Sequence, residues 1–464
     1  MRRRVLHGLH LACAAGGLAA LAASPGTALA ADDGFAAVVS GILGNATYEA
    51  ETVLSVFPRA GHNAESSGME DEPVEGWTHL SLDSTTFIGD AWSFGLGVDA
   101  VASTYRGAER GAFCLPGCRS GNGRFADLSR LTVTYLGDVV EVTAGKDDVA
   151  VGVAELYSPA DIYGRSNSAN PQHDVDFGVW HVRTDFYLGN DRLSAIILPV
   201  EESAPGPASH SRWSGGGGSG TSEFARIDIP WLPPSVTPDI QNDLRGSAPA
   251  EWGYLLKYDG AATGVDYFAT AYVGPGPFPV LRAPRPGQIN PYYKVRPRVS
   301  IASAGAAWTT GAAKLYAEGM GYLAAGGQDE DFTRGLIGAK YRETSIANRL
   351  GLDEITPVIE FAKEWVHGKQ DNMLYVVSSR EARPNRNNLM LSATVQVNSK
   401  WKVGGGYNRS LSDRDALTSL FVRYQPNDDL SFALSGAEYH GRDETMFGRF
   451  SRHDNVEFQM KYSF

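Results

Sequence analysis

The last ten residues of the chain read NVEFQMKYSF, from Asn455 to Phe464. Apolar side chains occupy every second position from Val456 onward, and polar side chains occupy the positions between them. Successive side chains of a β-strand point to opposite faces, so this alternation predicts a strand. One face of that strand is apolar as far as its final residue, and it must therefore meet apolar surroundings.

The same alternation recurs along most of the chain. Candidate strands lie near 45–57, 77–89, 91–106, 124–138, 139–149, 175–189, 191–201, 251–261, 263–274, 295–310, 312–325, 333–344, 354–367, 388–399, 401–412, 415–426, 429–440 and 453–464. No stretch has the period of a long amphipathic helix. The pattern predicts an all-β protein of about 18 strands, within a range of 16–18.

Short and long connections alternate between these strands. Turn signals such as Gly89-Asp90 and Gly189-Asn190 mark the short ones. The long ones lie at 58–76, 107–123, 150–174, 202–250, 275–294 and 368–387. Residues 345–353 are long for a short turn, whereas 326–332 and 412–414 are short for long loops. The alternation is expected of an up-and-down membrane barrel with short periplasmic turns and long extracellular loops.

The first 30 residues have the features of a secretory signal peptide. Arg2, Arg3 and Arg4 form a basic head, an apolar run follows, and Ala28-Leu29-Ala30 provides a small-residue cleavage site. We expect cleavage near Ala30, which leaves 31–464 as a single domain. No later apolar run reaches about 18 residues, so no transmembrane helix is expected.

The remaining two cysteines, Cys114 and Cys118, are separated by Leu-Pro-Gly. In an exported protein this spacing favours a small local disulfide, and two unpaired thiols are the alternative. Two cysteines are too few to predict a zinc site.

Composition and motif searches exclude several classes of function. The formal net charge is −12 with no basic block, which argues against nucleic-acid binding. The chain has no Gly-x-Ser-x-Gly elbow, no His-Glu-x-x-His and no Walker loop, so no enzyme, cofactor or metal is expected. The strands begin soon after the cleavage site, which leaves no room for the plug domain of an energised receptor.

The terminal strand ending in Phe464, together with the export signal, resembles the signature of Gram-negative outer-membrane β-barrels. The resemblance in architecture covers the whole of 31–464. It implies a transmembrane antiparallel up-and-down β-barrel in the outer membrane, whose last strand is read by the barrel assembly machinery. The stretch AGKDDVAVGVAELYSPADIYG, residues 144–164, more loosely resembles a segment of porin-like barrels.

Charged residues within the strands are expected to face a wet lumen, because a charge on the lipid face costs about 2–4 kcal/mol. With Val299 and Ile301 facing lipid, for example, Arg296 and Arg298 face the lumen. The expected channel-lining residues are Arg183, Asp185, Arg296, Arg298, Lys314, Glu318, Arg334, Lys340, Arg342, Glu360 and Glu364; Glu49, Glu51, Asp99 and His181 also point inward. These charges either select solutes or simply pair with one another on a wet wall.

The segment 150–174 combines apolar anchors with acids, which a loop that met only solvent would not need. We expect it to fold into the lumen and form a constriction through Glu155, Tyr157, Asp161 and Tyr163. The alternative is an external loop packed on itself.

Taken together, the sequence predicts an outer-membrane channel for passive diffusion of small hydrophilic or charged solutes. The expected partners are outer-membrane lipid and lipopolysaccharide. A non-channel barrel that acts as a scaffold or surface binding protein is the alternative, and a soluble exported β domain is a third possibility.

Overall fold

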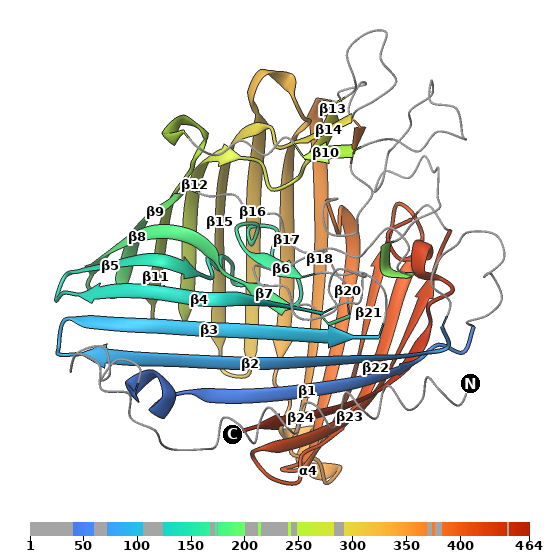
Figure 1. Ribbon diagram of the computed structural model, residues 1–464. Coiled ribbons are helices and arrows are strands. Elements are labelled where there is room, and N and C mark those ends of the chain that lie inside the picture. The colour runs from blue at the N-terminus through green and yellow to red at the C-terminus, as the bar shows by residue number, and fades with distance from the viewer. Residues whose placement is uncertain are drawn as a thin grey trace.

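The computed structural model describes residues 40–59, 72–104, 124–167, 172–173, 175–199, 212–214, 240–242, 248–282, 292–368, 374–375, 383–442 and 445–464. One antiparallel sheet of 18 strands dominates them. It closes on itself because β1 (Thr47–Val56) pairs both with β2 (Val74–Ile88) and with the last strand, β24 (Asn455–Ser463). Figure 1 shows the barrel from the side, with the near strands β1–β4 crossing the far strands β15–β18.

Every strand expected from the alternation has a counterpart in the barrel wall. The other wall strands are β3 (Trp92–Ser103), β4 (Arg124–Leu136), β5 (Val140–Asp147), β8 (Val179–Leu188), β9 (Asp191–Leu198), β11 (Gly253–Ala262), β12 (Val265–Pro275), β15 (Arg298–Thr310), β16 (Ala313–Ala324), β17 (Asp331–Tyr341), β18 (Glu354–Gly368), β20 (Asn387–Asn398), β21 (Trp401–Ser410), β22 (Ala416–Tyr424) and β23 (Leu430–His440). Each pairs with the wall strands before and after it in the sequence. The predicted all-β barrel of about 18 strands is confirmed.

The expected strand 175–189 is divided at Gly178. Its first part, β7 (Val175–Phe177), leaves the wall and pairs with β6 (Arg165–Asn167), while β8 continues in the barrel. The Gly178 amide donates to the carbonyl of Ser129 at 3.0 Å. A Cβ atom at Gly178 would lie 2.5 Å from that carbonyl oxygen, so only glycine permits this close approach.

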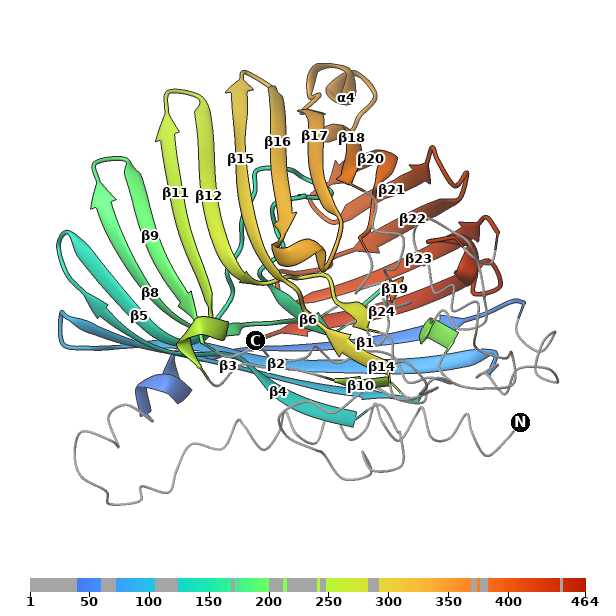
Figure 2. The same ribbon diagram turned by 90° about the horizontal axis from the view of Figure 1, so that it is seen from above.

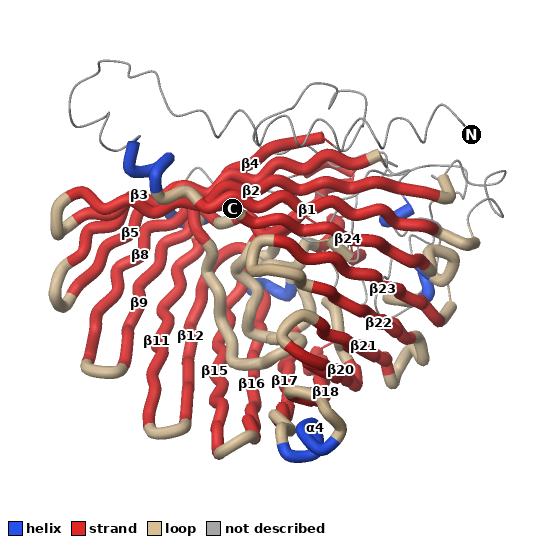
Figure 3. The backbone as a smooth tube through the Cα atoms, turned by 90° about the horizontal axis from the view of Figure 1, so that it is seen from below, coloured by secondary structure: helices blue, strands red, loops and turns tan. Residues whose placement is uncertain are grey.

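The tight turns gather at one rim of the barrel. Gly189 and Gly311 adopt φ values of 72° and 58° in two of these turns, a conformation that favours glycine. The helix α4 (Ser345–Arg349) lies at the same rim, between β17 and β18 (Figure 3). This helix explains why the connection 345–353 is long for a turn.

The alternation of the terminal strand separates an exposed outer face from an inner face. Phe458 and Met460 are exposed and stand opposite Leu54 and Thr52 of β1, as expected from the sequence. The ring of Phe464 stacks on Tyr48 with centroids 5.3 Å apart. Large exposed apolar side chains continue on this outer face around the barrel, among them Leu420, Leu434, Ile359 and Ile337.

A second, small sheet lies beyond the rim with the long connections (Figure 1). It contains β10 (Ile240–Asn242), β13 (Val280–Arg282), β14 (Tyr292–Val295) and β19 (Leu374–Tyr375). The remaining short helical turns are η2 (Arg212–Ser214), η3 (Pro249–Glu251), η4 (Ala325–Gly327) and η5 (Gly448–Phe450). No helix in the described part of the chain is long and apolar enough to cross a membrane. The predicted signal peptide and the pair Cys114–Cys118 lie outside the described residues.

Candidate functional site

A loop runs through the inside of the barrel against one part of its wall. We call residues 148–164, which follow β5, the inner loop. Figure 2 shows this segment within the ring of strands, close to β15 and β16. Its backbone is held by two carboxylates that project from the wall, Glu318 of β16 and Glu360 of β18.

Glu360 is fully buried and organises one turn of the inner loop. Its Oε1 accepts hydrogen bonds from the amides of Glu155 and Leu156 at 2.8 and 2.9 Å, and its Oε2 accepts one from the Tyr157 amide at 3.0 Å. The hydroxyl of Tyr316 donates to the same carboxylate at 2.7 Å. These bonds satisfy amides that have left water, and a charged acceptor makes them stronger than bonds to a neutral group.

Glu318 holds the preceding part of the loop in the same way. Its Oε1 accepts from the amides of Val153 and Ala154 at 2.5 and 2.7 Å, and its Oε2 accepts from the hydroxyl of Ser158 at 2.5 Å. Asp161 bonds within the loop and accepts from the Val151 amide at 3.1 Å. The two wall carboxylates therefore fix the path of the loop between Val153 and Ser158.

Glu155 of the inner loop lies between two lysines of the wall. The ammonium groups of Lys314 and Lys340 lie 2.6 and 2.8 Å from its two carboxylate oxygens. Burial acts to raise the pKa of the Glu155 carboxyl, but the hydrogen bonds from both lysines outweigh it and hold that pKa below its ordinary value of 4.5. Glu155 is therefore ionised over the neutral range.

Apolar side chains complete the contact between the inner loop and the wall. Val149, Val151 and Tyr163 belong to one buried cluster with residues of β12, β15 and β16. The rings of Tyr163 and Tyr272 lie 5.2 Å apart. The inner face of β12 and β15–β18 thus binds the loop through both apolar contacts and hydrogen bonds. We call this side of the barrel the covered wall.

This cluster reverses the orientation that the sequence suggested for β15. Val299 and Ile301 were expected to face lipid, but they are 1% and 2% exposed and pack inside the barrel. Arg298 consequently lies on the opposite face, at the rim, where it donates to the carbonyl of Ala250. The expectation that Arg298 faces the lumen is wrong, because the apolar side of this strand meets the inner loop rather than lipid. Arg296 precedes the strand and donates to the carbonyls of 276 and 277.

Arg334 points inward from β17 but lies beneath the inner loop. Its Nε lies 2.8 Å from Glu364 of β18, and its Nη1 donates to the hydroxyl of Tyr157 at 2.9 Å. Arg383 and Arg386 also lie within 3.4 and 2.7 Å of Glu364. The carboxylate is thus surrounded by three guanidinium groups, of which only Arg334 was expected to face the lumen.

The other predicted lining residues lie apart from the inner loop. Arg342 follows β17 at the rim with the tight turns, where it is exposed and pairs with Glu354. Arg183 pairs with Asp185 at 2.8 Å on the inner face of β8. Asp185 itself is completely buried and also accepts a hydrogen bond from Ser194.

A second group of polar side chains lies on the inner face of β24, β1, β2 and β3, which we call the open wall. They line a cavity of about 390 Å³ bounded by Glu49, Glu51, Trp77, His79, Asp99, Gln172, His173, Val175, Asp176 and Gln459. Glu49, Glu51 and Asp99 were expected to point inward, whereas His79 and His173 were not expected at this site. The alternation of β2 could have identified His79, which stands directly opposite Glu51. No periodic signal could have brought His173 to the same place, since it lies outside the strands.

Comparison with known proteins identifies the fold and nothing finer. No protein-family model matches the sequence, and no curated protein matches it. Among solved structures, Acinetobacter baumannii OccAB3 is similar with a TM-score of 0.50 and 11% identity, over 90% of this chain and 98% of that chain. Pseudomonas aeruginosa OccK2 (OpdF) matches at 0.48 and 12%, over 90% and 96%. A mutant of the Rh. blastica porin matches at 0.41 and 11%, over 90% and 99%.

The strand count, the closure of the sheet and the likeness to OccAB3 agree with the architecture that the terminal strand suggested. The chain has the fold of a porin-like, 18-stranded antiparallel β-barrel.

Proposed function

We propose that this protein is an outer-membrane channel for passive diffusion of small hydrophilic or charged solutes, with its pore narrowed by the inner loop. The observation that carries the proposal is the attachment of the inner loop to Glu318 and Glu360. A segment held against one wall by buried carboxylates reduces the open cross-section of the barrel at a fixed depth. Such a constriction sorts solutes by size and charge.

The outer face supports an outer-membrane location in a Gram-negative bacterium. Apolar side chains are exposed there, whereas the charged residues of the strands mostly point inward. A closed sheet leaves no unpaired edge, which is the condition for a β structure in lipid. Lipid and lipopolysaccharide would cover this face, and the last strand would present its alternating pattern to the barrel assembly machinery.

Charges on the two walls would give the channel its solute preference. Lys314 and Lys340 remain partly exposed on the covered wall, beside Glu155. Glu49 and Glu51 are partly exposed on the open wall. A solute that passes between the inner loop and the open wall would meet cations on one side and carboxylates on the other.

Conductance measurements test this proposal. The purified mature chain, inserted into a planar bilayer, should give ohmic steps. The double variant Glu318→Gln, Glu360→Gln should give larger steps, because the neutral amides cannot replace the charged acceptors of the inner loop. Glu438→Gln, on the exposed face of β23, is the matched control and should conduct like the parent.

Two outcomes would contradict the proposal in different ways. Silent membranes, with folding confirmed by heat-modifiable gel mobility, would refute the channel and favour a scaffold or surface binding role. Ohmic steps that are the same in the double variant and in the parent would retain the channel but refute narrowing by the inner loop.

A further inference from the structure

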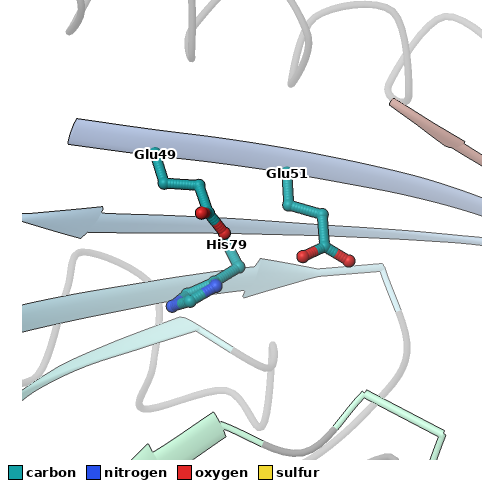
Figure 4. Close-up of side chains that lie close together, drawn as sticks. All are labelled: Glu49, Glu51 and His79. Carbon is teal, nitrogen blue, oxygen red and sulfur yellow. The ribbon is translucent and has the colours of Figure 1, made fainter. Parts of the chain in front are cut away.

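The cavity on the open wall is lined by two imidazoles, those of His79 and His173, and by four carboxylates, of which Glu49 and Glu51 belong to β1. Glu49 and Glu51 leave β1 on the same side, and the ring of His79 from β2 lies beside them (Figure 4). The three residues can each offer a ligand atom so that all three atoms lie within 4.8 Å of one another. Ligands of a tetrahedral Zn²⁺ ion are about 3.4 Å apart, so a small rotation of the side chains would close the set around an ion.

Each imidazole is oriented by a carboxylate outside this set. The Nε2 atom of His79 lies 2.7 Å from Asp99, and the Nε2 atom of His173 lies 3.0 Å from Glu457. A carboxylate can only accept a hydrogen bond, so each Nε2 carries the hydrogen and donates it, and each Nδ1 keeps its lone pair. A carboxylate bound to the distal nitrogen of a metal-binding histidine is the usual way in which proteins fix its tautomer and ring orientation.

Packing holds both rings next to the carboxylates of β1. Trp77 stacks on His173 with centroids 5.0 Å apart and contacts the ring of His79 at 5.6 Å. The Nδ1 atom of His173 lies 4.0 Å from the Oε1 atom of Glu51. The second imidazole is therefore placed to complete a site with two histidines and two glutamates.

The present partners of the glutamates leave room for an ion. Lys461 lies 2.7 Å from Oε1 of Glu49, and Gln459 donates to Oε1 of Glu51 at 2.6 Å. In both residues these contacts involve Oε1, so Oε2 can coordinate an ion. The positive charge of the Lys461 ammonium beside Glu49 would repel a divalent cation on the same carboxylate, and this repulsion lowers the affinity of the site.

We propose that Glu49, Glu51, His79 and His173 form a binding site for a first-row divalent transition metal ion, facing the lumen of the barrel. Mixed imidazole and carboxylate donors suit Zn²⁺, Ni²⁺ and Cu²⁺ better than Mg²⁺ or Ca²⁺, which take oxygen ligands. Asp99 and Glu457 act as positioning residues that orient the imidazoles. The metal site does not rest on the proposed channel, because its geometry is the same whether or not the barrel conducts.

The test is a titration of the untagged mature chain, folded in detergent, with Zn²⁺ by calorimetry and with Co²⁺ by visible absorption. We expect one ion per chain, and His79→Gln or Glu51→Gln should abolish binding. Asp99→Asn should weaken it by about 10–100-fold, the usual effect of removing such an orienting carboxylate. Lys461→Ala should tighten binding, because it removes the repelling ammonium group.

His440→Gln is the matched control, since this histidine is exposed at the end of β23. It should bind the ion like the parent chain. Heat-modifiable gel mobility shows which variants are folded. Lys461→Ala is a further control, because misfolding could weaken Zn²⁺ binding but could not tighten it. Absence of one-to-one binding in the parent, or equal binding in folded His79→Gln and Glu51→Gln, would overturn the proposal.

Discussion

The covered wall and the open wall use the same residue type for different purposes. Glu318 and Glu360 on the covered wall are 5% and 0% exposed, and their oxygens accept hydrogen bonds from the amides of the inner loop. Glu49 and Glu51 on the open wall have side chains 29% and 14% exposed and border a cavity. All four point inward from strands. Whether a lumenal carboxylate organises structure or remains available to a solute depends on whether a loop covers it.

Among these substitutions, Glu360→Ala should have the largest effect, because it releases the inner loop from the covered wall. Three loop amides would lose their acceptor, and we expect loop docking to lose about 3–5 kcal/mol. Limited proteolysis between residues 150 and 160 measures the released loop. Glu49→Ala, on the open wall, should leave the cleavage pattern unchanged. Equal protection of the loop in both variants would mean that Glu360 does not hold it.

A matched pair of isoleucines tests the reversed orientation of β15. Ile301→Ala removes a side chain from the buried cluster beneath the inner loop, so it should lower the free energy of unfolding by about 2–4 kcal/mol. Ile337→Ala removes one from the exposed outer face and should cost less. Denaturant unfolding of both variants, followed by tryptophan fluorescence, measures the difference. If Ile301→Ala lost no more than Ile337→Ala, Ile301 would face lipid and β15 would have the orientation suggested by the sequence.

Charge substitutions on the two walls should shift ion selectivity in opposite directions. Lys340→Gln removes a cation from the covered wall and should raise the cation-to-anion permeability ratio by roughly twofold. Glu51→Gln should lower that ratio. Reversal potentials under a salt gradient measure both changes. Arg342→Gln, at the exposed rim, serves as the comparison and should shift the potential less. Shifts of the same sign for Lys340→Gln and Glu51→Gln would refute the proposal that the two walls present opposite charges to a solute.

The smallest expected effect is a change of loop docking with pH. The pKa of Glu155 is lower in the folded chain than its ordinary value of 4.5. Its contribution to docking is therefore fully present above pH 4.5 and is lost as the pH falls through the folded-state pKa. Conductance noise should be constant above pH 4.5 and should increase only at pH values below 4.5, where the carboxyl of the folded chain takes up its proton. Glu155→Gln should remove this dependence, and an unchanged acid response in that variant would assign it to other groups.

Sequence alternation predicted the wall of the barrel well because a strand has only two faces. Each expected strand was found, and the outward positions of β1 agree with its register against β24. The same rule failed for Val299 and Ile301, since it assumes that apolar residues face lipid and that the lumen is wet. An apolar inner face exists here because the inner loop supplies an apolar partner.

The contents of the interior were less predictable because they depend on the path of the connections. Glu155, Tyr157 and Tyr163 stood out as residues that needed a partner. That Glu360 would bind the loop amides required knowledge of which turn of the loop lies beside which strand. His173 shows the same limit, because its neighbours Glu51 and Glu457 come from opposite ends of the chain.

The pairing of β1 with β24 has a consequence for the order of folding. Ser55 donates to Glu457 at 2.7 Å across a separation of 402 residues, so this seam carries a large loop-closure entropy. The cavity on the open wall takes residues from both sides of the seam and exists only after it has formed. Binding of an added Zn²⁺ ion in that cavity would thus indicate that β1 has paired with β24 and that the barrel has closed.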